Sequence, residues 1–167
     1  PMTKAYKALP PASELWELFD YKPLTGELFW RNPKGRAKRG VEAGKHSGTY
    51  KMLRANGVLA STHRYVWAWV YGETPSAGID HVNRDKHDNR VWNLRLATQA
   101  DNAGNTQKPC VDKYVTSSGR VRYRVRIQTY GVRRNVGNFD TYEEGVLAYK
   151  EAHKVAYGAF SPYIENL

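Results

Sequence analysis

The sequence predicts an α+β protein of two small domains, and three local patterns indicate it. A strand at Ile79–Asn83, a polar turn at Arg84–Arg90 and a second strand at Val91–Ala97 are followed directly by a helix that opens at Thr98. Further along, arginine alternates with apolar residues from Arg120 to Ile127, which is the period of a β-strand. Apolar residues then recur at helical spacing over Tyr142–Tyr157. The first domain is therefore expected to contain a strand–strand–helix unit. The second is expected to be a small three-stranded antiparallel sheet packed on one helix.

The chain carries a strong excess of positive charge. Its 167 residues include 26 Lys and Arg against 16 Asp and Glu, so the formal net charge is +10 and the pI is near 9.7. Nucleic acid is the commonest polyanionic partner of such a chain. No run approaches 18 apolar residues, no signal-peptide core is present, and no basic amphipathic helix has a clean apolar face. We therefore expect a soluble, cytoplasmic protein that binds no membrane.

Cysteine usage excludes two kinds of covalent bracing. Cys110 is the only cysteine, so the chain has no internal disulfide, which is consistent with a reducing compartment. Paired CxxC sequences are absent as well, so no zinc knuckle is expected. Any bracing of a functional site must come from packing, for which five tryptophans and 12 tyrosines supply large apolar area.

Two helices and two hairpins are expected ahead of residue 79. A helix at Glu14–Asp20 comes first, followed by a hairpin over Tyr21–Trp30. Asn56-Gly57 is the strongest short signal for a hairpin turn, so a strand is expected on either side of it. Apolar spacing then predicts a helix over Arg64–Tyr71. We expect its aromatic residues to form the wall on which the strand–strand–helix unit rests.

Asp80 and His81 offer the chemistry of a phosphodiester site. Asp80 is a hard oxygen ligand of the kind that Mg²⁺ and Mn²⁺ prefer. A neutral His81 imidazole can take a proton from water, because histidine titrates near neutrality. Thr98 and Asp101 match a capping box, so Asn102 lies near the positive N-terminal end of the next helix. Strand, turn, strand and helix would bring Asp80, His81 and Asn102 around one point, which suits a metal ion and a phosphate.

The order and spacing of these residues resemble the His-Asn-His (HNH) endonucleases, also called ββα-metal or His-Me finger nucleases, in the form common among phage and homing enzymes. The matching positions are Asp80-His81, Asp88-Asn89-Arg90, Asn93 to Thr98, Asn102 and Asn105, with a lead-in at His63 to Trp67 and Gly72 to Pro75. The competing interpretation is a solvated polar turn, since aspartate and asparagine are common in turns and caps. The agreement of order, spacing and hydrophobic frame favours the nuclease.

The resemblance implies a role for each matched residue. His81 would be the general base, and Asp80 and Asn102 would bind one Mg²⁺ or Mn²⁺ ion. Asn93 would brace the turn and orient the histidine. The third letter of the signature is Asn102 here instead of histidine, which leaves a weakly basic metal ligand. His63 is expected to start a helix or to pack beneath the site.

Several basic residues near this site are expected to meet DNA. A glycine-punctuated loop from Arg31 to Lys45 carries six Lys and Arg against Glu42 alone. Such a run is usually a solvated, mobile loop, and the alternative is contact with backbone phosphates. Arg64 or Arg95 would clamp a phosphate, unless they form salt bridges at the edge of the core. The full set expected to contact DNA is Arg64, Arg95, Asn105, Arg120, Arg122, Arg124, Arg126, Arg133, Arg134, Lys38 and Arg39.

The second domain is expected to present an arginine face. A linker around Pro109 separates residues 1–107 from residues 108–167. The alternation over Arg120–Ile127 places four guanidinium groups on one face of a strand, without acidic partners, and four apolar groups on the other. Such a sheet can enter a duplex groove, whereas the alternative is a charged edge exposed to solvent. A helix opens at the capping box of Thr141, with Val146, Tyr149, Ala152, Val155 and Ala156 toward the sheet.

The second domain also resembles the Apetala/ethylene-response-factor (ERF) type of DNA-binding domain. The resemblance covers about Lys113 to Ser161 and lies in Tyr123 to Ile127, Val136 to Thr141, Glu143-Glu144, Ala148-Tyr149, Ala152 and Gly158 to Phe160. Tyr123 replaces the usual tryptophan. Gly145 stands where alanine is usual, at a cost of about 1 kcal/mol in helix propensity. Base preference does not transfer across these changes.

Together these features predict a metal-dependent endonuclease for duplex DNA, of a nicking or homing type. We expect it to be phage-encoded, to act in the bacterial cytoplasm, and to be a monomer or weak dimer with no evident protein partner. The rival from another class is a DNA-binding regulator whose nuclease module has decayed. A nuclease directed at RNA is the third possibility.

Overall fold

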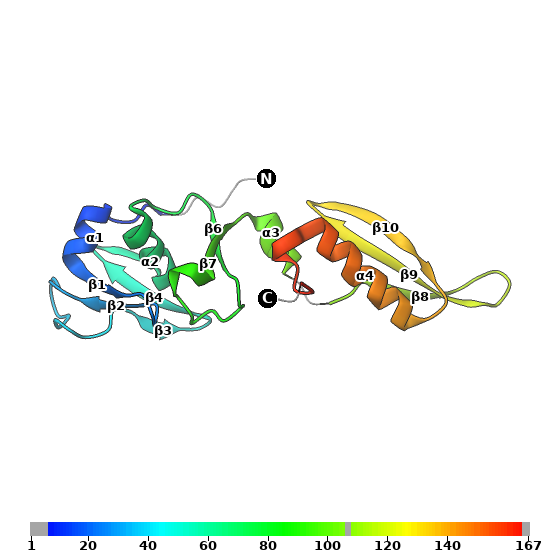
Figure 1. Cartoon of the computed structure of the whole chain (residues 1–167), viewed down its shortest axis with the longest axis horizontal. Coiled ribbons are helices and arrows are strands. Elements are labelled where there is room, and N and C mark those ends of the chain that lie inside the picture. Colours follow the sequence, from blue (N-terminus) through cyan, green and yellow to red (C-terminus); the bar gives the residue numbers. More distant parts are fainter. Residues whose placement is uncertain (1–6, 106–107, 165–167) are drawn as a thin grey trace. The chain divides into compact units, whose positions relative to one another are not determined.

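The computed structural model describes residues 7–105 and 108–164. The chain divides into two compact units, one ending at Ala97 and the other beginning at Thr98. Both combine helices with small antiparallel sheets, which confirms the α+β class (Figure 1). The sequence predicted a domain boundary near residue 107. The helix that follows Thr98 packs on elements of the second unit and is described with it. Within the described ranges, no helix is long and apolar enough to span a membrane.

The first unit begins with helix α1 (Ala12–Leu18), which runs directly into strand β1 (Phe19–Lys22). Strand β2 (Glu27–Trp30) pairs with β1 in an antiparallel hairpin, as predicted. Phe19 faces Trp30 in the register, and the two ring centroids lie 4.6 Å apart. This contact joins the hairpin to the core.

A three-stranded sheet of order β3-β4-β5 follows, built from Lys45–Ser47, Tyr50–Ala55 and Val58–Ser61. Asn56 and Gly57 connect β4 to β5 with φ angles of 47° and 78°. Two successive positive φ angles are what a type I′ turn requires, and asparagine and glycine adopt them most readily. The predicted hairpin is confirmed.

Helix α2 (Thr62–Tyr71) is the centre of the core in this unit. Seven of its ten residues are buried. Tyr65 is fully buried, meets the ring of Phe19 at 6.2 Å, and donates its hydroxyl to the carbonyl of Val58. Gly72 ends the helix in the left-handed conformation, as the sequence predicted. Nearly continuous burial makes α2 a rigid support for the elements around it.

The first unit closes with a second hairpin. Strand β6 (Gly78–His81) pairs antiparallel with β7 (Leu94–Ala97). The connecting loop ends in the 3₁₀ turn η1 (Val91–Asn93), where the sequence predicted strand. Strand cannot begin at Val91 because the backbone N–H of Asn93 bonds to the carbonyl of Arg90 and closes a turn there.

The second unit is a three-stranded antiparallel sheet covered on one face by a helix. Its elements are α3 (Gln99–Gly104), β8 (Val111–Val115), β9 (Val121–Thr129), β10 (Val132–Phe139), α4 (Tyr142–Tyr157) and the 3₁₀ turn η2 (Gly158–Phe160). The sheet order is β10-β9-β8, and α4 packs mainly on β9. This arrangement confirms the predicted sheet packed on one helix. The capping boxes that open α3 and α4 are confirmed as well.

The prediction of which α4 residues face the sheet is partly wrong. Tyr149 and Tyr157 face the core as buried residues, but Val155 is 88% exposed. His153 takes a core position instead and is 1% exposed. The face through Tyr149, His153 and Tyr157 advances in steps of four, so Val155 points away from the sheet at 100° per residue. Gly104 brings α3 so close to Tyr157 that an added Cβ would lie 2.2 Å from the ring.

Candidate active site

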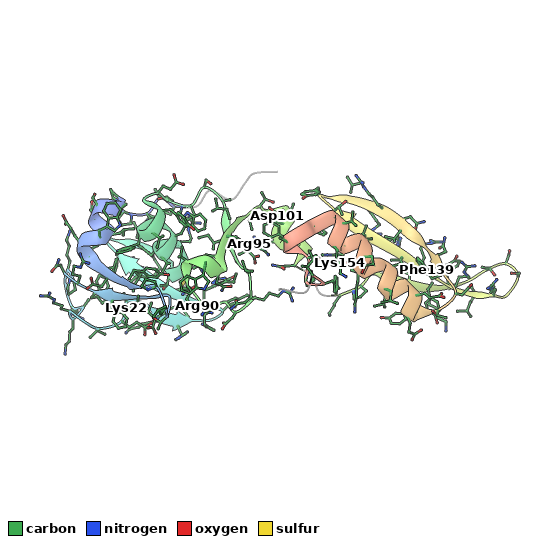
Figure 2. All side chains as sticks on the ribbon, in the orientation of Figure 1. Lys22, Arg90, Arg95, Asp101, Phe139 and Lys154 are labelled. Atoms are coloured by element: carbon green, nitrogen blue, oxygen red, sulfur yellow. The ribbon has the colours of Figure 1, made fainter. Side chains whose placement is uncertain are left out.

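The β6–β7 hairpin sets Asp80 opposite Arg95. The two residues are register partners, so their side chains leave the same face of the hairpin. Arg95, labelled in Figure 2, donates from Nε and Nη2 to Asp80 Oδ2 at 2.8 and 2.6 Å. The side chains of Arg95 and Asp80 are only 20% and 11% exposed. The carboxylate that the sequence predicts as a metal ligand therefore has a cation from the neighbouring strand beside it.

His81 follows Asp80 on β6 and lies in the interior of the first unit. Its ring is 3% exposed, and Nε2 lies 3.1 Å from Oδ1 of Asn89, which is 5% exposed. The ring of His63 on α2 meets it edge-on at 5.2 Å, and Tyr50 on β4 stacks at 6.4 Å. Helix α2, strand β4 and the loop that carries Asn89 therefore hold the ring, by packing and by one hydrogen bond. His63 packs beneath the candidate site, which is one of the two positions expected for it.

His63 is held uncharged beside His81. Burial, the His81 ring and the nearby Arg64 guanidinium together lower the pKa of His63 to about 3. Its Nε2 lies 2.9 Å from the hydroxyl of Ser61. A neutral ring in this position adds no charge next to His81, and its own nitrogen is engaged elsewhere.

Asn93 braces the loop between the two strands. Its Oδ1 accepts from the backbone N–H of Asn83 at 2.9 Å. Its Nδ2 donates to Asn83 Oδ1 and to the carbonyl of Asp88, each at 2.9 Å. Asn93 is 5% exposed, so these bonds form away from solvent. These bonds of Asn93 go to the loop, and the ring of His81 is contacted by Asn89.

The first hairpin supports the same loop from outside. The hydroxyl of Tyr21 accepts the backbone N–H of Val91 at 2.9 Å. Gly26, with φ of 78°, lies so close that a Cβ there would sit 2.3 Å from the nitrogen of Arg90 and 2.4 Å from the carbonyl carbon of Asn89. Packing therefore performs the bracing that a chain with one cysteine cannot obtain from a zinc knuckle.

The donor chemistry of Asp80 and Asn102 suits a hard divalent ion, because both offer oxygen. Among the residues that the structure describes, no three His, Cys, Asp or Glu side chains gather as a metal site. Asn102 lies on α3, is exposed, and belongs to the second unit. Asp80 and His81 are consecutive residues of β6, and Asn102 belongs to the second unit. Asn105, also expected near DNA, caps the C-terminal end of the same helix.

The arginine face of β9 differs from expectation in one respect. The sequence predicted no acidic partners, and this is wrong. Asp140 pairs with Arg120 at 2.9 Å and with Arg122 at 3.1 Å, and Asp112 on β8 pairs with Arg126. Both aspartates are distant in sequence from the arginines, which is why the alternation alone could not reveal them.

Arg124 is the exception within this face. In the part of the chain that is described, it has no ion pair, and its guanidinium lies 4.9 Å from the ring centre of Tyr114. Tyr114 in turn donates its hydroxyl to Asn138 Oδ1. An exposed cation over an aromatic ring is free to meet an anion or a base edge.

The remaining basic residues that are expected to contact DNA differ in how deeply they are buried. Lys38, Arg39, Arg133 and Arg134 are exposed. Arg64 is 6% exposed and donates to the carbonyls of Pro75 and Ala77. Arg64 therefore holds the segment that leads into β6, and its buried position does not suit direct DNA contact.

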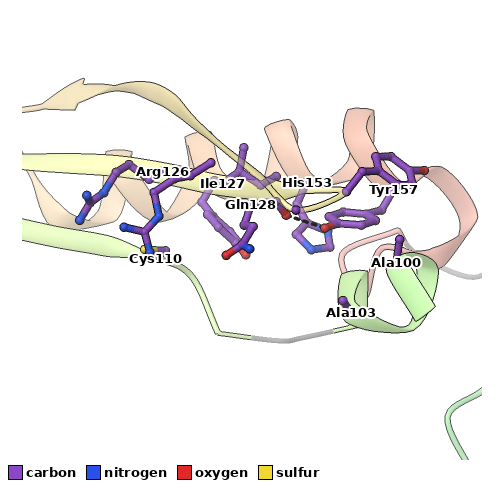
Figure 3. Close-up of a pocket in the computed structure, with 12 residues that line it drawn as sticks. Ala100, Ala103, Cys110, Arg126, Ile127, Gln128, His153 and Tyr157 are labelled. Atoms are coloured by element: carbon purple, nitrogen blue, oxygen red, sulfur yellow. Dashed lines mark hydrogen bonds between the residues drawn. The ribbon is translucent and has the colours of Figure 1, made fainter. Parts of the chain in front are cut away.

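A cavity of about 390 Å³ lies within the second unit, at the end of β9 beyond the last residues paired with β8 (Figure 3). Tyr157 donates its hydroxyl to the carbonyl of Gln128 across one side of this cavity. His153 lies in the wall, buried, with Nδ1 2.9 Å from the hydroxyl of Ser161. Burial lowers the pKa of His153, which keeps that ring neutral as well.

Comparison with known proteins adds a family likeness to this geometry. Residues 60–103 match the family model of the HNH endonucleases. These residues, the HNH segment, include Asp80, His81, Asn89 and Asn93. A relative described as an uncharacterized HNH endonuclease, from Acanthamoeba polyphaga mimivirus, is 27% identical over 101 residues.

The match to that relative covers 59% of this chain and 54% of the relative, so the chain spans about half the length of the curated protein it matches. No solved structure shows a significant match. The likeness of the HNH segment supports a nuclease of the hydrolase class. The family match ends at residue 103, and the ERF resemblance of the later sheet stays a prediction.

Sequence reasoning missed two contacts around His81. Asn89 was part of the matched motif, but turns use asparagine so often that its residue type carries no sign of a buried contact. Tyr50 comes from a hairpin about 30 residues upstream and has no local signal that relates it to the site. Tyr21 on β1, which braces the loop, could not be identified from the sequence either, because its hydrogen-bond partner is a backbone group.

Proposed function

We propose that the chain is a metal-dependent endonuclease that hydrolyses phosphodiester bonds of duplex DNA. The observation that carries the proposal is a buried imidazole next to a carboxylate on one strand, inside the HNH segment. His81 is 3% exposed and hydrogen-bonded, and Asp80 is held by Arg95. A general base must be fixed within reach of its proton, and such packing fixes it.

His81 accepts the proton of the attacking water in this proposal. Asp80 and Asn102 would hold one Mg²⁺ or Mn²⁺ ion, which when bound supplies positive charge for the scissile phosphate and the departing 3′ oxygen. Asn93 keeps the loop closed, through its bonds to Asn83 and Asp88.

The sheet of the second unit is proposed to bind the duplex. Phosphate neutralisation by arginine supplies most of the affinity in such interfaces, and arginines in the major groove read base edges. Arg124, Arg133 and Arg134 are exposed on β9 and β10. The net charge of +10 agrees with a polyanionic partner. The ERF resemblance suggests the same use of the sheet.

One site of this kind cuts one strand, so a monomer is expected to nick DNA. A second cut needs a weak dimer or a second encounter. The relative comes from a virus, which supports a viral origin; within this proposal the enzyme is phage-borne, of nicking or homing type, and acts inside a bacterial host. These are parts of the proposal and depend on the activity.

Supercoiled plasmid tests the proposal directly. With Mg²⁺ or Mn²⁺ the protein should convert the plasmid to the nicked circle, and EDTA should stop the reaction. Mapping the ends should show a 5′ phosphate and a 3′ hydroxyl. Tight DNA binding without cleavage in either metal would favour a DNA-binding regulator with a decayed nuclease module. Cleavage of structured RNA alone would assign the site to an RNA substrate.

A further inference from the structure

The contact between His81 and Asn89 fixes more than the direction of a ring. Nε2 of His81 lies 3.1 Å from Oδ1 of Asn89, and the two residues are 3% and 5% exposed. An amide oxygen can only accept a hydrogen bond, so the nitrogen that meets it must carry the proton. In a neutral imidazole, the other nitrogen then holds the free lone pair.

We infer that Asn89 is a positioning residue that holds His81 in the tautomer protonated at Nε2, so that Nδ1 is the nitrogen that accepts a proton. The catalytic meaning of this inference rests on the proposed function, whereas the tautomer itself does not. Asn93 holds the loop through its bonds to Asn83 and Asp88, and Asn89 supplies the link from that loop to the ring.

The backbone on both sides of Asn89 is held independently of its side chain. Asn93 Nδ2 donates to the carbonyl of Asp88 at 2.9 Å. Asp88 also accepts from Arg90 through side chain and backbone. Gly26 lies against the carbonyl group of Asn89 itself. The amide oxygen is therefore presented to His81 from a segment with little freedom to move.

Three other residues lie beside the ring. His63 meets His81 edge-on at 5.2 Å, and its Nε2 is engaged with Ser61. Tyr50 lies face to face with the ring at 6.4 Å. Asp80 is the preceding residue on the strand and is held by Arg95. An amide also orients the ring without placing another negative charge beside that carboxylate.

Two variants at Asn89 separate the effect of the acceptor oxygen from the effect of side-chain packing. Asn89→Leu keeps a side chain of similar shape and removes the acceptor oxygen, whereas Asn89→Asp keeps an acceptor oxygen. Long-range ¹H–¹⁵N correlation spectra of the labelled full chain, without metal or DNA, identify the protonated nitrogen of His81. We expect the Nε2–H pattern in the unaltered chain and in Asn89→Asp, and its loss or a mixture in Asn89→Leu.

Kinetics supply the second measurement. Loss of a partner that orients a catalytic group typically costs about 10- to 100-fold in activity. Asn89→Leu should lower kcat by that factor and leave KM for DNA nearly unchanged, with the thermal midpoint recorded to verify folding. An Nδ1–H pattern in the unaltered chain, or an unchanged Nε2–H pattern in Asn89→Leu, would overturn the inference. An Nε2–H pattern that depends on Asn89 in a chain that never cuts DNA would support the inference and contradict the proposed function.

Discussion

Arg95 on β7 donates two hydrogen bonds to a single oxygen of Asp80 on β6, at 2.8 and 2.6 Å. A divalent ion that binds Asp80 must share this carboxylate with the guanidinium or displace it. A DNA phosphate is the natural second partner for a displaced guanidinium, since arginine matches phosphate oxygens in the same forked geometry. In the proposed site, the pair would link metal binding at Asp80 to phosphate binding by Arg95.

Replacement of Arg95 should cost stability because it leaves a carboxylate with little solvent. Arg95→Met should lower the free energy of unfolding by about 1–3 kcal/mol, the range for a buried polar group that loses its partner. Urea unfolding measures the loss. Arg31→Met is the matched control, since Arg31 and Asp20 form an exposed pair with side chains 43% and 45% accessible, where solvent screening should make the loss smaller. Equal, small losses in both variants would contradict the burial argument.

Gly26 should matter to the site without touching it. Gly26→Ala adds a Cβ 2.3 Å from the nitrogen of Arg90 at a positive φ of 78°, so the loop that carries Asn89 must shift. Gly57→Ala has the same φ and nothing within 4 Å of the added Cβ, so it carries the backbone cost alone. Gly26→Ala should lose more than about 1 kcal/mol of stability and most of the cleavage rate. A Gly26→Ala chain that behaves like Gly57→Ala would show that the hairpin does not brace the loop.

Acid should destabilise the first unit through His63. The folded pKa of about 3 lies below the ordinary value of 6.5, so the unfolded chain binds more protons between these values. Stability therefore falls as pH drops from about 6.5 toward 3, by up to about 1.4 kcal/mol per pH unit. His63→Gln should flatten this dependence in chemical unfolding of the first unit. His87→Gln, at an exposed position, should leave it unchanged; the reverse order would refute the assignment.

The acidic partners of the arginine face should limit DNA binding. Arg124→Ala should reduce the slope of log affinity against log salt by about 1, because one phosphate contact is lost. Asp140→Asn should do the opposite, since it releases Arg120 and Arg122. Gel shifts over a salt series measure both slopes. Lys154→Ala, which alters a cation paired with Glu151 on α4, is the control. Unchanged slopes in both Arg124→Ala and Asp140→Asn would show that the arginine face is merely exposed to solvent and does not contact DNA.

Local sequence signals predicted most of the elements in this fold. Asn56-Gly57 and the capping boxes at Thr98 and Thr141 each depend on residues a few positions apart, and each is confirmed. The prediction that Val155 faces the sheet was wrong, because apolar type alone does not settle which side of a helix faces the sheet. Strand β7 began late because a turn hydrogen bond at Asn93 outweighs the apolar character of Val91.

Contacts between distant parts of the chain could not be predicted. The Asp80–Arg95 pair depends on the register of two strands, and both residues were named as candidates without their pairing. Asp140 and Asp112 reach the arginines of β9 only after the sheet has formed. The position of α3 depends on a close contact of Gly104 with Tyr157, which no local pattern indicates. The family likeness of the HNH segment was more accessible than the geometry because order and spacing can be read from the sequence alone.

The central claim is that His81 is the base of a nuclease, and one paired measurement tests it most directly. Wild type and His81→Ala are compared for nicking of supercoiled plasmid in Mg²⁺ and Mn²⁺, and for gel-shift affinity on the same DNA. The account predicts that His81→Ala loses cleavage by at least about 100-fold, the lower range for a general base, with binding affinity nearly unchanged. Undiminished nicking by His81→Ala would contradict it.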